Sequence, residues 1–399
     1  MKLLYIDQYF TFPNQVGGTR SYDLSRSFAQ KGIEVVVISS SHEHHVDSAG
    51  NWSVIQQDGI TLHRLNCRYN NKMSFFRRIY AFLYFMFFAT LRSLKIKCDM
   101  FLVSSTPLTV AIPALVKKLI HRTPYIFEAR DVWPEVPIKM GVIKNIFLCK
   151  LLYGFEGLIY KKASWIVPLS DGMKNNILSR FDISEKITVI PNISEISRFH
   201  LEKKEILSDR SSKILLYAGT MGAVNGLRYL VDLAYLTLKI DRTIQYHIYG
   251  SGKQESELRK YAIERGVSEV NLFFKGKVSK SELPIVYASA TVGSSFVIDN
   301  SVLWDNSANK FFDTLAASKP IVINHEGWQA DVIRSCNIGY VLPPTIEEVD
   351  ACKFVKYLNN VGYISQQGSN ALEVAKERYS LVKASNKYME IFKNLSANV

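Results

Sequence analysis

A lysine and an aspartate, Lys310 and Asp313, lie three residues apart in segment 303–313, which follows a predicted buried strand at 291–297. Ser307 is a good N-cap residue, so we expect a helix that it opens, with Lys310 in the first turn. A cation there opposes the helix dipole unless an anion is bound, and the Asp313 carboxylate suits the hydroxyls of a ribose. The pattern predicts a site for a phosphorylated nucleoside, with an ordinary Lys–Asp helix pair as the alternative.

Three more charged residues, Glu128, Arg130 and Asp131, follow a predicted strand at 125–128. Unpaired charges are costly to bury, so we expect these side chains to face a cleft or one another. Facing a cleft, they are candidate catalytic groups. In the alternative, Arg130 is structural and pairs with Asp131 or Glu128.

Two glycines, Gly17 and Gly18, stand between the predicted strand 2–7 and a helical segment at 19–31. Such a pair lets the backbone approach a ligand and aims helix N–H groups at an anion. A plain turn is the alternative. No Walker A or G-x-G-x-x-G sequence occurs, which removes the best support for nucleotide hydrolysis and dinucleotide binding.

The elements that position these residues alternate along the chain. We expect strands in the first half at 2–7, 34–39, 100–105, 125–128, 165–170 and 187–191, with helices such as 19–31 and 171–180 between them. A polar stretch at 194–212 interrupts the pattern, which resumes with strands at 213–219, 245–250, 271–276, 291–297 and 320–324. This predicts an α/β chain of two doubly wound parallel sheets, whose ligands bind beyond the carboxyl ends of the strands.

The length, composition and charge of the chain limit the classes of protein and of partner that fit it. The 399 residues suffice for two domains, and 47% hydrophobic with 21% charged residues excludes a disordered chain. Residues 1–200 hold 25 Lys and Arg against 15 Asp and Glu, a net charge of +10, which indicates an anionic partner. The strongest basic and aromatic stretch reads as an apolar helix and not as a recognition helix, so nucleic acid is only a distant alternative.

That stretch, residues 73–97, has an apolar core at 79–91 that is shorter than the roughly 20 residues of a spanning helix. It is bracketed by Arg77, Arg78, Arg92, Lys95 and Lys97. We therefore expect an interfacial helix on an anionic membrane, with a buried core helix as the alternative. Five scattered cysteines and no signal-peptide core favour a cytoplasmic chain, peripheral on the inner face of the membrane.

The motifs together resemble the family 4 glycosyltransferases, in particular bacterial members that build O-antigen, capsule or exopolysaccharide. The segments that carry the resemblance are 17–22 (GGTRSY), 128–134 (EARDVWP), 217–220 (YAGT), 225–227 (NGL), 247–252 (HIYGSG), 274–278 (FKGKV) and 309–322 (NKFFDTLAASKPIV). They cover nearly the whole chain in the family's order.

The resemblance implies a GT-B fold, two doubly wound Rossmann-like domains facing a central cleft. An acceptor-binding domain would span 1–194 and a nucleotide-sugar-binding domain 195–379, with a helix at about 380–399 packing back on the first. Implied donor-binding residues are Gly17, Gly18, Gly219, Thr220, Asn225, Gly250, Val278, Asp305, Ser307, Asn309, Lys310 and Asp313. Candidate catalytic residues are Glu128, Arg130, Asp131 and Lys310.

Two departures from the family bear on these roles. Its paired acidic motif falls on Asp305, near the transferred sugar, and Asp313, on the ribose, although Glu is usual at both. Its His-Asp pair falls on Arg130 and Asp131, so no histidine role transfers. Its basic residues are missing from 220–225, which leaves Lys310 to neutralise the diphosphate, with Arg130 reaching across.

The resemblance further implies transfer of a sugar from a nucleotide-sugar, UDP-linked, to a membrane polyprenyl-diphosphate-linked saccharide, with retained anomeric configuration. No cofactor and no metal are expected, because the Asp-x-Asp motif of the GT-A fold is absent. A sugar-nucleotide epimerase of the same fold is the alternative.

Overall fold

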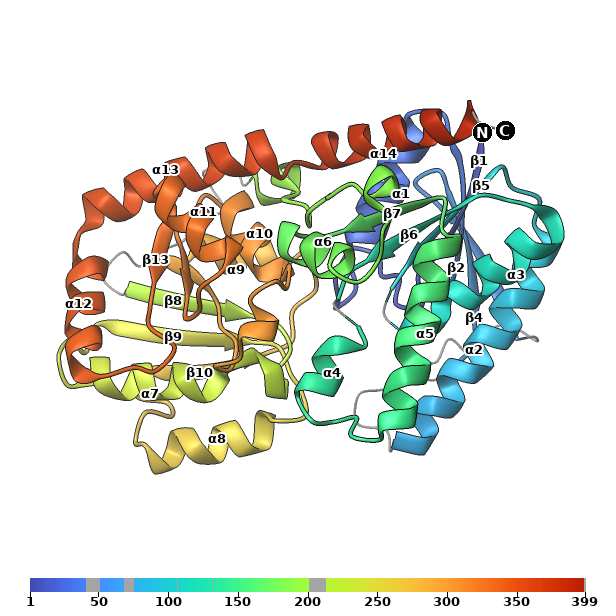
Figure 1. Cartoon of the computed structure of the whole chain (residues 1–399). Helices are drawn as coiled ribbons and strands as arrows, with labels where there is room; N and C mark the ends of the chain where they lie inside the picture. Colours follow the sequence, from blue (N-terminus) through green and yellow to red (C-terminus); the bar gives the residue numbers. More distant parts are fainter. Residues whose placement is uncertain (41–50, 68–74, 106, 132, 201–212, 398–399) are drawn as a thin grey trace. The chain divides into compact units, whose positions relative to one another are not determined.

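The computed structural model describes residues 1–40, 51–67, 75–105, 107–131, 133–200 and 213–397 (Figure 1). The chain forms two compact units. The first consists of Met1–Phe12, Gly18–Pro191 and Leu381–Val399, and the second of Pro13–Gly17 and Asn192–Ser380. The units therefore change over at Pro191, three residues before the boundary expected at 194, and the last helix belongs to the first unit.

A seven-stranded sheet forms the centre of the first unit, in the order β3-β4-β2-β1-β5-β6-β7. Its strands are β1 (Lys2–Ile6), β2 (Glu34–Ser40), β3 (Trp52–Gln57), β4 (Ile60–Leu65), β5 (Met100–Ser104), β6 (Tyr125–Ala129) and β7 (Trp165–Pro168). All neighbours are parallel except β3 and β4. The strand order reverses between β1 and β5, which makes that position the place where such sheets bind ligands.

The helices of the first unit cover both faces of this sheet. They are α1 (Arg20–Gln30), α2 (Phe75–Lys95), α3 (Ile112–His121), α4 (Glu135–Lys139), α5 (Ile146–Lys162), α6 (Asp171–Leu178) and α14 (Leu381–Ser396). The Phe28 ring of α1 packs edge-on against Tyr388 and Phe392 of α14, and α2 packs beside α3. Because helices cover both faces, β5 and β6 are buried along their whole length and read as continuous apolar runs.

A six-stranded parallel sheet forms the centre of the second unit, in the order β10-β9-β8-β11-β12-β13. Its strands are β8 (Lys213–Ala218), β9 (Ile244–Tyr249), β10 (Leu272–Gly276), β11 (Val292–Ser295), β12 (Ile321–Ile323) and β13 (Gly339–Val341). Its helices are α7 (Leu227–Leu238), α8 (Glu255–Glu264), α9 (Leu283–Ala288), α10 (Asn309–Ala316), α11 (Trp328–Cys336), α12 (Glu348–Asn359) and α13 (Val361–Arg378). This is the dinucleotide-domain strand order, with the reversal between β8 and β11.

The predicted α/β architecture of two doubly wound sheets is confirmed, with two local errors. Residues 187–191 form no strand: Ile187 makes only an isolated bridge to Ile166. The hairpin β3–β4 was missed because β3 is a polar, largely exposed edge strand. Its turn, Asp58-Gly59, has positive φ angles of 53° and 77°, the two-residue hairpin turn that an Asp-Gly sequence favours.

Candidate functional site

Lys310 occupies the first turn of α10, the helix that follows β11, and its side chain lies along the loop after β8. Its Nζ is 3.4 Å from Oδ1 of Asn225 and 5.1 Å from the centre of the Tyr217 ring. A Cβ atom at Gly219 would stand 3.1 Å from Cδ of Lys310, so glycine provides the room for this lysine. The strand order reverses between β8 and β11, and Lys310 joins the loop after β8 to the helix that follows β11.

The loops after β8 and β9 touch through their backbones. Gly250 has φ +134°, and a Cβ there would stand 1.9 Å from the carbonyl oxygen of Gly219, so no larger residue fits. The Gly250 N–H donates to the carbonyl of Gly276 at the end of β10. The carbonyl of Thr220 accepts from Asn225 Nδ2 at 2.8 Å. Predicted donor-binding residues from three loops therefore form one edge of this sheet.

The charge of Lys310 has no direct protein counterion in the part of the chain that the structure describes. Burial lowers its pKa from 10.5 to about 8, although the negative charge of Asp313 partly offsets this. Lys310 is half-buried, and a partly desolvated ammonium group held by neutral neighbours favours a bound anion. A diphosphate group fits this chemistry.

Asp313 is engaged by a lysine that the sequence analysis missed. Nζ of Lys280 lies 2.5 Å from each carboxylate oxygen of Asp313, and the two side chains are 7% and 9% exposed. Lys280 stands in the loop after β10, two residues beyond Val278. Strand order alone places that loop at the same edge, but the sequence does not distinguish Lys280 from its exposed neighbours Lys275 and Lys277.

The expected N-cap at Ser307 is wrong. Helix α10 begins one residue later, with Ala308 in an extended N-cap conformation and no side-chain cap. Ser307 is buried, and its Oγ makes no hydrogen bond with the described residues, while its carbonyl accepts from Asn192 Nδ2. Asp305 and Asn309 are half-buried on either side of it.

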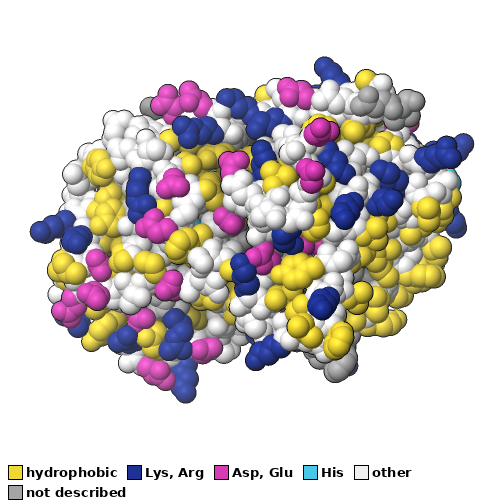
Figure 2. Space-filling view, viewed as in Figure 1, with side chains coloured by type: hydrophobic (Ala, Val, Ile, Leu, Met, Phe, Trp, Pro, Cys, Tyr) yellow, Lys and Arg dark blue, Asp and Glu magenta, His cyan; other side chains and the backbone are white. Residues whose placement is uncertain are grey.

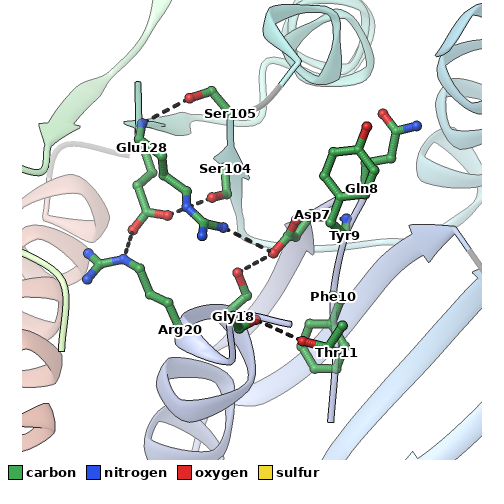
Figure 3. A network of polar contacts seen from close by, with 12 residues as sticks. Asp7, Gln8, Tyr9, Phe10, Thr11, Gly18, Arg20, Ser104, Ser105 and Glu128 are labelled. Atoms are coloured by element: carbon green, nitrogen blue, oxygen red, sulfur yellow. Dashed lines mark hydrogen bonds and ion pairs between the residues drawn. The ribbon is translucent and has the colours of Figure 1, made fainter. Parts of the chain in front are cut away.

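Glu128 is enclosed in the first unit. Its side chain is 0% exposed and accepts hydrogen bonds from Nε of Arg20 at 2.8 Å and the Ser104 hydroxyl at 2.6 Å (Figure 3). It also accepts from the Tyr388 hydroxyl at 2.5 Å. Burial alone would raise the pKa of this carboxyl, but Arg20 and Arg130 outweigh burial and lower it. Glu128 is therefore a buried counterion in this structure, and its partner is Arg20 instead of the expected Arg130.

Arg130 and Asp131 lie where the strand order of the first sheet reverses. Nη1 of Arg130 is 3.7 Å from Oδ2 of Asp7 at the end of β1, and its backbone N–H donates to the Ser105 hydroxyl at 2.9 Å (Figure 3). The Arg130 side chain is 23% exposed, and Asp131 is exposed. The catalytic roles of both residues stay predictions.

The glycine loop after β1 is divided between the units, because Gly17 belongs to the second and Gly18 to the first. In the first unit the carbonyl of Gly18 accepts from the Thr11 hydroxyl at 2.8 Å (Figure 3). In the second, the carbonyl of Gln15 accepts from the Lys280 N–H at 3.3 Å. The predicted anion contact of this loop stays a prediction.

The residues that the structure describes contain no cluster of three or more His, Cys, Asp or Glu suited to a metal ion. None of their helices combines the length and apolarity that a membrane crossing requires.

Comparison with known proteins covers most of the chain. Residues 17–198 match the family described as Glycosyltransferase Family 4, and residues 199–371 match Glycosyl transferases group 1. The poly(ribitol-phosphate) alpha-N-acetylglucosaminyltransferase of Staphylococcus aureus is 22% identical over 232 residues, 58% of this chain and 44% of that protein. The putative colanic acid biosynthesis glycosyl transferase WcaI of Escherichia coli is 28% identical over 134 residues, 32% of each.

Solved structures show the same fold. Anabaena HepE in complex with UDP-glucose has a TM-score of 0.73 at 14% identity, over 99% of this chain and 100% of that one. The chain spans about half the length of the curated relatives that it matches. These matches do not favour the epimerase alternative. The two family matches in series, the motifs and the paired Rossmann-like sheets show that this chain belongs to the family 4 glycosyltransferases and has the GT-B fold.

Proposed function

We propose that the chain transfers a glycosyl unit from a UDP-linked sugar to a membrane polyprenyl-diphosphate-linked saccharide in the assembly of a surface polysaccharide such as O-antigen or capsule. The observation that carries this proposal is the half-buried ammonium group of Lys310, which has no direct counterion among the described residues, at the ligand-binding edge of the second sheet. HepE binds UDP-glucose, which supports the proposed donor class. The names of the Staphylococcus aureus and Escherichia coli relatives refer to poly(ribitol-phosphate) and colanic acid, which supports the proposed acceptor class.

In the proposed reaction the acceptor oxygen forms a bond to the sugar's anomeric carbon and loses its proton, while the bond from that carbon to the diphosphate breaks. UDP leaves with an added negative charge. Lys310 favours this step because its fixed positive charge stabilises the leaving diphosphate more strongly than the bound donor. Asp305, Ser307 and Asn309 border the sugar and phosphates, and the configuration is retained without a metal or cofactor.

Helix α2 supports a membrane-bound acceptor. Ala81, Phe85 and Ala89 face the core and are at most 3% exposed, as the buried-helix alternative expects. The outward stripe of α2 is nevertheless apolar: Tyr80, Leu83, Phe87 and Leu91 are 44–67% exposed. Helix α2 therefore has a face buried in the core and an exposed apolar face on the other side. An interfacial helix requires such an exposed apolar face.

Helix α5 adds a second apolar stripe that the sequence analysis did not single out. Phe147, Leu151 and Leu158 stand at helical spacing and are 79%, 68% and 46% exposed. Figure 2 shows a broad apolar area with scattered Lys and Arg over α2, α3 and α5. Segments 73–98, 105–123 and 136–155 contain no Asp or Glu. An apolar surface with only basic charges favours anionic lipid.

Two experiments test this proposal. The first incubates the protein with a UDP-sugar, with and without membranes that contain polyprenyl-linked saccharides. We expect a lipid-extractable glycosylated product that requires the membranes. A C-epimer of the donor formed without any acceptor would instead establish the epimerase.

The second experiment measures co-sedimentation with vesicles that contain phosphatidylglycerol. The double variant Phe147→Ser/Leu151→Ser should lose binding, whereas Ile263→Ser, which changes an equally exposed residue of the second unit at 68% exposure, should keep it. Equal binding of the double variant and the parent would contradict the membrane surface.

A further inference from the structure

We propose that Lys280 is a positioning residue, which holds the Asp313 carboxylate so that the ammonium group of Lys310 stays available to the diphosphate of the donor. This inference rests on the proposed function. It concerns three side chains of the second unit, and the family resemblance assigned no role to Lys280.

The geometry shows that Asp313 is fully committed to Lys280. Both carboxylate oxygens lie 2.5 Å from the same Nζ, and each side chain is less than one-tenth exposed. The backbone on either side of Lys280 is also fixed, because the N–H groups of Lys280 and Ser281 donate to the carbonyls of Gln15 and Pro13 at 3.3 and 2.9 Å. The lysine thus approaches Asp313 from an anchored loop.

The alternative partner of Asp313 is Lys310. The two residues are three apart on α10, the spacing at which side chains of opposite charge meet on a helix. Lys310 Nζ instead lies at the Asn225 amide oxygen. Two ammonium groups stand near one carboxylate, which is paired with Lys280, so one positive charge remains in excess and Lys310 carries it.

Removal of the Lys280 charge should reverse this arrangement. Asp313 would then be a buried carboxylate without a partner, which is costly, and the nearest remaining cation on its helix is Lys310. An ion pair with Asp313 would raise the pKa of Lys310 above its present value of about 8 and draw the ammonium group away from the donor.

A purely structural ion pair would lower stability without these effects, so the test reads the titration of Lys310 directly. The variants are Lys280→Met, the conservative Lys280→Arg, Asp313→Asn, and the double variant Lys280→Met/Asp313→Asn, which removes both charges. The rate of acetylation of Lys310 is followed by mass spectrometry as a function of pH, a readout that needs no donor. UDP-sugar binding is measured in parallel by calorimetry, below the melting temperature of each variant.

We expect Lys280→Met to raise the pKa of Lys310 and to weaken UDP-sugar binding by about tenfold or more. Lys280→Arg should resemble the parent. Without the Asp313 carboxylate the loss of Lys280 should have no further effect, so the double variant should bind the donor as Asp313→Asn does, with a pKa of Lys310 below that of the parent.

An unchanged pKa of Lys310 in Lys280→Met would overturn the inference, as would weaker donor binding by the double variant than by Asp313→Asn. If the single variant does not fold, the double variant decides: it must bind the donor as well as Asp313→Asn does, with a lowered pKa of Lys310. A raised pKa in Lys280→Met combined with a parent that binds no nucleotide-sugar would instead contradict the proposed function.

Discussion

Lys310 Nζ meets the side-chain amide oxygen of Asn225 at 3.4 Å, beside the face of the Tyr217 ring. The cation therefore has a neutral acceptor and an aromatic face as neighbours, and neither cancels its charge. In most members that the chain resembles, basic residues follow the first strand of this domain, whereas residues 220–225 contain none. Lys310 reaches the same loop from α10, and we expect it to supply the missing charge.

The pH dependence of catalysis should follow Lys310. Its ammonium form pairs with the diphosphate, and burial lowers its pKa from 10.5 to about 8. The value of kcat/KM, which reflects the free enzyme, should therefore fall as pH rises through about 8. A bound diphosphate favours the ammonium form and raises the pKa, so kcat should fall only at higher pH. Steady-state kinetics from pH 6 to 10 measure both profiles, and an alkaline limb shared by the parent and Lys310→Ala would contradict the assignment.

Replacement of Asp313 should affect stability as well as donor binding. Asp313→Ala leaves the buried Lys280 ammonium without its counterion, which we expect to cost about 3–5 kcal/mol. A ribose contact made equally in the ground and transition states would appear in KM more than in kcat. Melting curves and kinetics of Asp313→Ala and Asp313→Asn test this. Normal stability would mean that the Lys280 pair is weak, and an unchanged KM would remove Asp313 from the donor site.

Glu128 and Arg130 should separate into a structural and a catalytic residue. Glu128→Gln leaves the buried Arg20 guanidinium uncompensated and should destabilise the protein by about 3–5 kcal/mol. Arg130 is partly exposed and its ion pair is long, so Arg130→Gln should change stability by less than about 1 kcal/mol and lower activity. Denaturant unfolding and transfer assays compare the two. If Glu128→Gln is stable but inactive, Glu128 has a catalytic role and not only a structural one.

Metal removal should leave transfer intact. The resemblance implies a metal-free reaction in which fixed positive charge acts on the diphosphate, and Lys310 supplies such charge. Activity should therefore persist after EDTA treatment and dialysis. A loss that magnesium restores, while zinc and buffer alone do not, would show that the diphosphate requires a divalent cation.

The fold was largely predictable because it depends on repeated local signals. Buried strands such as β5 and β6 are continuous apolar runs, and their alternation with helices determines the class of sheet. The edge hairpin β3–β4 lacks that apolar signal, although Asp58-Gly59 marked its turn. Residues 187–191 are apolar enough for a strand, and Thr188 and Ile190 donate to carbonyls of β7, but the segment forms only an isolated bridge at Ile187.

The site was predictable only to the level of loops. Strand order brings the loops of Gly219, Gly250 and Lys310 to one edge, and their sequence motifs pointed there. The pairing of charges depends on tertiary distances that no local spacing encodes. Glu128 therefore has Arg20 as its partner, 108 residues away, and Asp313 has Lys280, 33 residues away.

Donor binding tests the central claim most directly. The melting temperature of the parent is measured with UDP-, GDP- and ADP-linked sugars and compared with that of Lys310→Ala and of the control Lys353→Ala, an exposed lysine of α12. A ligand that binds the native state raises the melting temperature. We predict that a UDP-linked sugar stabilises the parent and Lys353→Ala, and that Lys310→Ala melts normally without ligand but loses most of this stabilisation. A parent that no nucleotide-sugar stabilises, or a Lys310→Ala variant stabilised as much as the parent, would contradict the account.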